Sequence, residues 1–370
     1  MNLAQLETRL VPLYLSSVAP GGGPPEILSD PGIGKTSTTE TVAQRLEQAF
    51  AGKRFGYVSI NGASVTLSHA TGYLILDGDG DRSKFSKPDW WFKTRNADNS
   101  FCGDGLEAFD GGVIIIDESD KLGVDEKKIM GEGALSKILG SHPLPPGWCI
   151  WFLGNYPKNR SGSTKQLDHL INRVKRIHIK FDLDAWDAWA ERSGLLPEVR
   201  NFAKENVLLM PEPAPEEQGP WCTPRSLHQC DIDLQTQMRV VNSPVPLTDP
   251  LTQEEMAGRI GTAAAAMLMA QLKLGQALPP YEEILANPDT APVPSKPDAL
   301  RLSSYRLAYL VKPKELDPIM RYVKRMKMEE FQIIFGKNLI TKDVKCITNP
   351  AFVQWAKTKM QLIALMVTLK

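Results

Sequence analysis

The strongest constraint on the fold is a glycine-rich segment between a short apolar stretch and a helical pattern. Residues 29–36 read Ser-Asp-Pro-Gly-Ile-Gly-Lys-Thr. In loops of this kind, backbone N–H groups converge on a phosphate, the lysine reaches the β and γ oxygens, and the adjacent hydroxyl binds Mg²⁺. The segment therefore predicts a phosphate-binding loop, with a plain turn between strand and helix as the alternative.

The first position of the loop departs from the usual pattern, which asks for glycine where this chain has Ser29. Serine fits there if its φ stays negative, and glycine is kept at the two positions that turn beside the phosphate. From Thr36 to Phe50 we expect one helix, whose N-terminus would point its positive dipole end at the phosphates. The expected phosphate-binding residues are Asp30, Pro31, Gly32, Ile33, Gly34, Lys35, Thr36 and Ser37.

A second motif supports the first. Four β-branched residues, Val113 to Ile116, are followed by Asp117 and Glu118, the pattern of a buried parallel strand that ends in charge at the carboxyl edge of a sheet. We expect Asp117 to hold Mg²⁺ and Glu118 to orient or deprotonate the water that attacks the γ-phosphate. The alternative, an exposed acidic turn, is weakened by the loop upstream.

The order of the remaining patterns indicates an α/β fold with a doubly wound parallel sheet, followed by helices. Strand patterns alternate with helices up to about Phe181, and helical patterns separated by proline-rich joints follow. The five cysteines are odd in number and lack C-x-x-C spacing, which is typical of reduced thiols in a cytoplasmic protein and gives no zinc site. The expected strands are 26–28, 56–60, 113–116, 150–153 and 174–179.

Three polar residues later in the chain stand where they could serve the same site. Asn155 ends the fourth expected strand, where it could sense the γ-phosphate. Arg173 precedes the fifth strand at a surface from which it could reach the nucleotide of a neighbouring subunit. Thr223 and Pro224 start a helix on which Arg225 would face the nucleotide.

This ordered set of motifs resembles the AAA+ ATPases, and within them the MoxR-like branch. The segment from His69 to Tyr73 and the Asp-x-x-Trp-x-x-Trp pattern between Asp182 and Trp189 are similar as well. The resemblance implies a P-loop NTPase core at 1–181 with an insert at about 73–109, an α-helical lid at 182–275, and a helical C-terminal extension at 276–370.

The resemblance also implies an activity and partners. They are Mg²⁺-dependent ATP hydrolysis, a ring that is usually hexameric, and a remodelled protein client, often with a von Willebrand A-type domain. Within such a ring Asn155 would be the first sensor, Arg173 the arginine finger in trans, and Arg225 the second sensor. Alternatives stay open, since Asn155 could be a turn former, Arg160 or Arg176 could replace Arg173, and Arg225 could pair with a carboxylate.

Two other features leave the function open. Lys312 to Lys370 carries a surplus of basic residues, with Arg321, Lys324, Arg325 and Lys327 in one helical stretch, so a nucleotide-gated nucleic-acid binder is the rival hypothesis. Trp90-Trp91-Phe92 in the insert could grip a partner or pack internally. We expect no export signal and no membrane anchor, because the apolar stretches are short or interrupted by charge.

Overall fold

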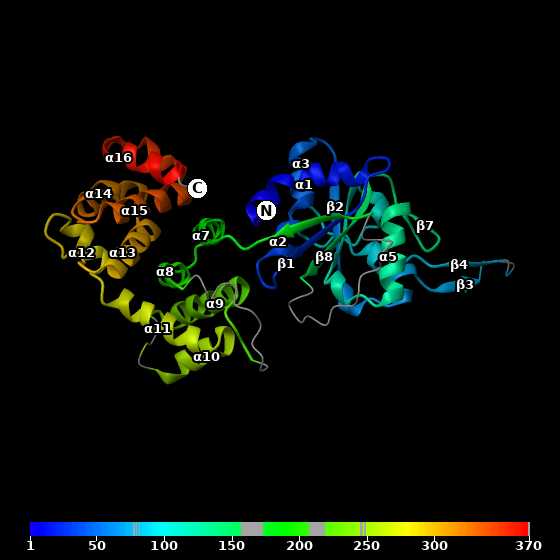
Figure 1. Ribbon diagram of the computed structural model, residues 1–370, viewed down its shortest axis with the longest axis horizontal. Coiled ribbons are helices and arrows are strands. Elements are labelled where there is room, and N and C mark those ends of the chain that lie inside the picture. The colour runs from blue at the N-terminus through cyan, green and yellow to red at the C-terminus, as the bar shows by residue number, and fades with distance from the viewer. Residues whose placement is uncertain are drawn as a thin grey trace. The chain divides into compact units, whose positions relative to one another are not determined.

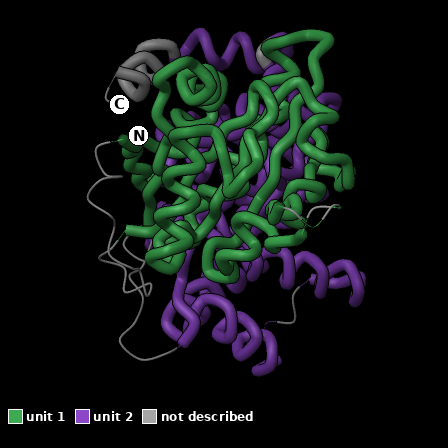
Figure 2. Tube along the Cα trace, turned by 90° about the vertical axis from the view of Figure 1, so that its right-hand side faces the viewer, with its two compact units in different colours: residues 1–182 green, residues 183–370 purple. Residues whose placement is uncertain are grey.

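The computed structural model describes residues 1–76, 82–156, 173–206, 219–244 and 249–368, together with Gly78, Gly80 and Leu247. For residues 347 and 360–368 only the backbone is described. The chain divides into two compact units, Met1–Asp182 and Leu183–Lys370, which have different colours in Figure 2. The finer division into core, lid and extension stays a prediction.

Unit 1 is built on a five-stranded parallel sheet in the order β2-β5-β8-β1-β9. All five strands expected from the sequence are present, and helices cover both faces of the sheet (Figure 1). The predicted doubly wound parallel α/β sheet, followed by a helical region, is confirmed. The strands are Pro25–Ser29 (β1), Phe55–Asn61 (β2), Gly111–Asp117 (β5), Trp148–Asn155 (β8) and Lys175–Ile179 (β9).

Alternating residues of the strands fill two cores, one on each side of the sheet. On one side, Val113 and Ile115 pack with residues of α1 (Leu3–Val18) and α3 (Val42–Ala49). On the other side, Ile114 and Ile116 pack with residues of α5 (Val124–Ser136) and of the insert. Because both faces are covered, the strands read as continuous apolar runs rather than as alternating ones.

The single helix expected from Thr36 to Phe50 is wrong in detail. The structure has a short α2 (Lys35–Thr39) and a separate α3 (Val42–Ala49), with a turn at residues 40–41. Threonine hydroxyls explain the break, because Thr39 Oγ1 donates to the carbonyls of Lys35 and Thr36, and Thr41 Oγ1 donates to that of Thr38. Such bonds compete with the helix ladder and bend it.

The insert after β2 is anchored by its tryptophans. It follows α4 (Leu67–Thr71) and contains the hairpin of β3 (Leu74–Leu76) and β4 (Ser83–Phe85), and a 3-10 turn at Asp89–Phe92. Trp90 and Trp91 are buried in the core under the sheet, whereas Phe92 is 46% exposed. Of the three rings, Phe92 alone remains available to a partner.

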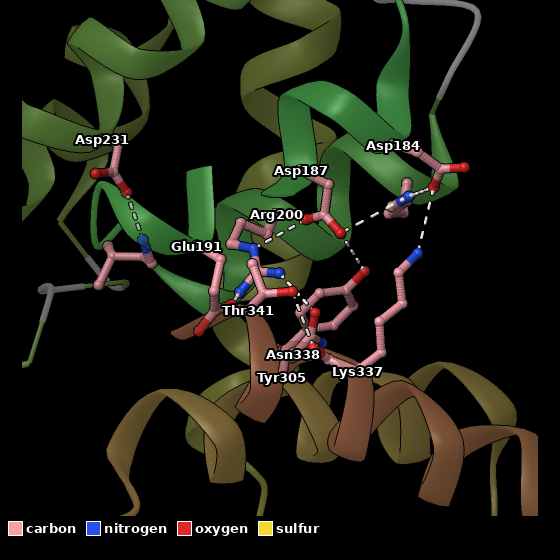
Figure 3. A network of polar contacts seen from close by, with 11 residues as sticks. Asp184, Asp187, Glu191, Arg200, Asp231, Tyr305, Lys337, Asn338 and Thr341 are labelled. Atoms are coloured by element: carbon pink, nitrogen blue, oxygen red, sulfur yellow. Dashed lines mark hydrogen bonds and ion pairs between the residues drawn. The ribbon is translucent and has the colours of Figure 1, made fainter. Parts of the chain in front are cut away.

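Unit 2 is helical in its described residues. Its largest apolar core joins α12, α13, α14, α15 and α16. Arg200 is fully buried and contacts Asp187, Glu191 and Asn338, so that one guanidinium ties three helices together (Figure 3). The helices are Leu183–Arg192 (α7), Pro197–Glu205 (α8), Pro224–Val241 (α9), Pro250–Ile260 (α10), Thr262–Gln276 (α11), Tyr281–Ala286 (α12), Pro297–Leu310 (α13), Leu316–Lys324 (α14), Glu329–Lys342 (α15) and Pro350–Thr368 (α16).

Candidate nucleotide-binding site

The glycine-rich loop joins the end of β1 to the start of α2, at the carboxyl edge of the sheet. Gly32 has φ 74° and Gly34 has φ 102°, a left-handed conformation that side chains rarely adopt. Ser29 lies at the end of β1, paired with Asn155 and Ile179, so the departure from glycine leaves the strand intact. The loop thus has the strand, turn and helix that a phosphate cradle requires.

The residues that flank the loop glycines differ in how far they are buried. Ile33 is buried in the core, which fixes the loop to the body of the sheet. Asp30 and Pro31 are half-buried, while Ser37 is exposed on α2. Of these, Ile33 has a structural reason to be apolar that the motif alone does not give.

Lys35 and Asn155 meet at this edge although 120 residues separate them. The Lys35 Nζ donates to Asn155 Oδ1 at 3.2 Å and to Ser29 Oγ at 3.3 Å. The pairing of Ser29 with Asn155 in adjacent strands brings the amide to the loop. These contacts hold the Lys35 ammonium group beside the loop, where a bound phosphate would lie.

Thr36 and Asp117 form the second pair. Thr36 Oγ1 donates to Asp117 Oδ2 at 2.7 Å, and Asp117 Oδ1 accepts from the Glu118 N–H at 2.9 Å. A hydroxyl and a carboxylate are hard oxygen donors that suit Mg²⁺. No group of three or more His, Cys, Asp or Glu side chains in the described residues could hold a metal. A magnesium ion on Thr36 and Asp117 would therefore take its other ligands from phosphate and water.

Glu118 adopts a strained backbone. Its φ is 51° and ψ 37°, in the left-handed region where a residue other than glycine is uncommon. Its Oε1 lies 3.0 Å from Lys121 Nζ, and both side chains are about one-third exposed. Strain of this kind clusters at functional sites because the surrounding structure must impose it.

Three further residues shape this edge and were not singled out from the sequence. Gly62 directly follows β2, and a β-carbon added at Gly62 would lie 2.8 Å from the Glu118 carbonyl oxygen. Glu40 is half-buried, and burial, followed by the nearby Asp117, raises its pKa, although a bond to Ser59 opposes this. Asp120 accepts a bond from the Asn155 N–H at 3.0 Å. The position of Glu40 four residues after Thr36 was the one signal available in the sequence.

The structure distinguishes between Arg173 and Arg176, two of the three candidates for the arginine finger. Arg176 Nε donates to Glu26 Oε2 at 2.8 Å, so Arg176 is engaged within its own chain. Arg173 is exposed, and no partner is recorded for its side chain in the described part of the protein. Arg160 lies outside the described residues.

Arg225 lies in unit 2, exposed on the first turn of α9. The predicted helix start is present, since Thr223 Oγ1 accepts from the Ser226 N–H and Pro224 occupies the first turn. The role of Arg225 as second sensor stays a prediction.

The basic cluster near the C-terminus is only partly available. Arg321 pairs with Asp289, and Arg325 donates to the Pro288 carbonyl. Lys324 and Lys327 are exposed and line a pocket of about 580 Å³ together with Lys359, which is paired with Glu329 of the same lining. Within this pocket the positive charge of Lys359 is therefore already offset by a carboxylate.

Comparison with known proteins leaves the family open. No protein-family model matches this chain, and no curated protein does. Similar solved structures include NtrX from Brucella abortus in complex with ADP, with 12% identity and a TM-score of 0.36 over 96% of this chain and 68% of that one. Another is the Thermotoga maritima RuvB Holliday junction branch migration motor, with 15% identity and a TM-score of 0.33 over 77% of this chain and 74% of that one. Values this low say nothing of function.

No helix in the described residues has both the length and the apolar character needed to cross a bilayer.

Proposed function

We propose that this chain is an AAA+ ATPase of the MoxR-like branch that binds ATP and hydrolyses it with Mg²⁺. The observation that carries the proposal is the meeting of Lys35, Thr36, Asp117 and Asn155 at one edge of the sheet. Sequence segments far apart supply these groups, and a plain glycine-rich turn has no need of them. The strained Glu118 beside them supplies a carboxylate that can act on water.

Each residue has a distinct task in this proposal. The loop N–H groups and Lys35 bind the β and γ oxygens, and Thr36 and Asp117 hold magnesium, which supplies charge neutralisation on the phosphates. Glu118 orients the attacking water and takes its proton. The Asn155 amide, which is hydrogen-bonded to Lys35, would contact the γ-phosphate.

The assembly proposed for the chain is a homo-oligomeric ring, most simply a hexamer, located in the cytoplasm. Arg173 supports this, because an exposed arginine without a recorded partner in the described residues can act on a neighbour's nucleotide, whereas Arg176 is held by Glu26. In that ring, Arg225 of the helical lid acts as second sensor. Movement of the lid against the core would remodel a protein client, of which a von Willebrand A-type domain is one candidate.

The chemical step is tested by Glu118→Gln, which keeps the side-chain size and removes the base. We expect this variant to bind ATP with the affinity of the wild type and to lose turnover by a factor on the order of 10² or more. Lys35→Ala should lose binding itself. Glu132→Gln, a change of the same type at an exposed site on α5, serves as control. Wild-type turnover by Glu118→Gln would exclude the proposed base.

The action in trans is tested by mixing subunits. Arg173→Ala and Glu118→Gln should each be inactive, because one lacks the finger and the other lacks the base. Mixed rings contain some interfaces with both groups intact, so part of the activity should return. If no activity returns although both variants assemble, Arg173 does not act in trans.

A second candidate function is a nucleotide-gated nucleic-acid-binding ATPase. The pocket that carries the exposed Lys324 and Lys327 favours it, because phosphates bind where cations lie close together. In that case DNA should stimulate ATP hydrolysis, the stimulation should fall steeply between low and physiological salt, and a double change of Lys324 and Lys327 to alanine should remove it. Hydrolysis that is indifferent to DNA favours the client remodeller.

A further inference from the structure

Asp120 binds the backbone at the end of β8. It lies in the 3-10 turn Ser119–Lys121, directly after Glu118, and is 9% exposed. Its Oδ1 accepts the backbone N–H of Asn155 at 3.0 Å. A β-carbon on Gly154 would lie 3.2 Å from the same oxygen, so glycine lets the strand settle against the carboxylate.

A cation on α5 offsets the charge of this carboxylate. Lys127 is 8% exposed, and burial lowers its pKa while Asp120 and then Glu26 raise it. Glu26 is itself bonded to Arg176. Burial of a carboxylate is costly unless a counter-charge is near, so Lys127 offsets part of the cost of burying Asp120.

A neutral oxygen could also accept the Asn155 N–H, but a carboxylate such as that of Asp120 has an advantage in bond strength. A bond from an N–H to a carboxylate is shorter and about twice as strong as a neutral one. Asn155 is the last residue of β8, and its side chain accepts a hydrogen bond from Lys35. Asp120 binds the backbone N–H of Asn155 and Lys35 binds its side-chain amide, so both groups of this residue are fixed.

We infer that Asp120 is a positioning residue for Asn155. It fixes the end of β8 to the turn that carries Glu118, so that the Asn155 amide and the Glu118 carboxylate face the same phosphate. This inference rests on the proposed ATPase function, in which Asp120 acts through Asn155.

The test is a double-mutant cycle between Asp120 and Asn155. Asp120→Ala should lower kcat by about tenfold to a hundredfold, the usual effect of losing a residue that orients a functional group, with KM for ATP nearly unchanged. Asp120→Asn keeps an acceptor oxygen and should recover only part of the rate, because a neutral acceptor forms the weaker bond. In an Asn155→Ala background, Asp120→Ala should cost nothing further, because the side chain that it positions is gone. Asp125→Ala, an exposed site on α5, is the control.

A second measurement needs no nucleotide. Hydrogen exchange at the Asn155 amide should be faster in Asp120→Ala than in the wild type, and intermediate in Asp120→Asn. If Asp120→Ala does not fold, Lys127→Met replaces it, since loss of the counter-charge should lower kcat in the wild type but not in Asn155→Ala.

Two results would overturn the inference, namely losses of rate that multiply in the double variant and an unchanged exchange rate at Asn155. A merely structural role of Asp120 predicts that first result, together with a lower melting temperature and a proportional loss of active protein. Wild type and Glu118→Gln are assayed first. Absence of turnover in the wild type sinks both proposals, whereas turnover with a multiplicative cycle sinks this one alone.

Discussion

Gly62→Ala tests the geometry of the site edge through a single methyl group. A β-carbon at Gly62 would lie 2.8 Å from the Glu118 carbonyl oxygen and 2.9 Å from that of Asp117. Both are backbone atoms, which cannot rotate away as a flexible side chain would. The added methyl must therefore push the end of β2 away from the turn that carries the two carboxylates.

The size of the effect follows from these contacts. Overpacking of a tight site costs about 1–3 kcal/mol. For a unit of this size, 1 kcal/mol shifts Tm by about 2–4 °C, so scanning calorimetry should show a decrease of about 2–12 °C. Turnover should fall further than the folded fraction, because misplacement of a catalytic group by about 1 Å costs on the order of 10²-fold.

Gly78→Ala is the matched control, because a β-carbon at Gly78 meets no atom within 4 Å and the residue is not in the left-handed region. It should leave Tm and turnover unchanged. A Gly62→Ala protein that melts and turns over like this control would show that β2 does not approach the turn as closely as described.

Three further predictions concern buried charge and thiols. Arg200→Met should lower the free energy of unfolding of unit 2 by about 3–5 kcal/mol in denaturant titration, because the carboxylates that Arg200 pairs with stay buried without it; an unchanged midpoint would contradict this. Burial raises the pKa of Asp231 from 3.8 to about 6, so the folded state binds the proton more tightly and stability should fall by about 2–3 kcal/mol as pH rises from about 4 to 6. Asp231→Asn should flatten that part of the curve, and an equally steep curve in the variant would assign it to another group. Burial also raises the pKa of Cys149 to about 12, so iodoacetamide at mildly alkaline pH should label half-exposed Cys102 first, and early labelling of Cys149 would refute its burial.

The sequence predicted the sheet well because its signals are local. Each expected strand is a short apolar run that ends at a polar or glycine residue, and the burial of both faces makes such runs distinctive. The pairing of Lys35 with Asn155 was not predicted, since it depends on β1 and β8 being neighbours in the sheet. Strand order is a property of the whole chain and leaves no mark on either strand.

The misjudged details have physical causes as well. The helix after the loop breaks at residues 40–41 because threonine hydroxyls bond to its carbonyls, an effect that a count of apolar spacings does not register. From the sequence, Trp90 and Trp91 could either form an interface with a partner or pack internally. Only the fold shows that they are buried in the apolar core on one face of the sheet. The bond between Asp120 and the Asn155 N–H depends on β8 lying beside the turn, which neither local sequence indicates.

The left-handed backbone of Glu118 bears on how an inactive form should be built. A glutamine at this position would keep the conformational penalty of the native residue, whereas asparagine or glycine tolerates that region better and would relieve it by up to about 1 kcal/mol. A Glu118→Asn protein should therefore have a higher melting temperature than the wild type. If Glu118 is the base proposed above, the strained backbone is a loss of stability that comes with keeping the carboxylate at this position.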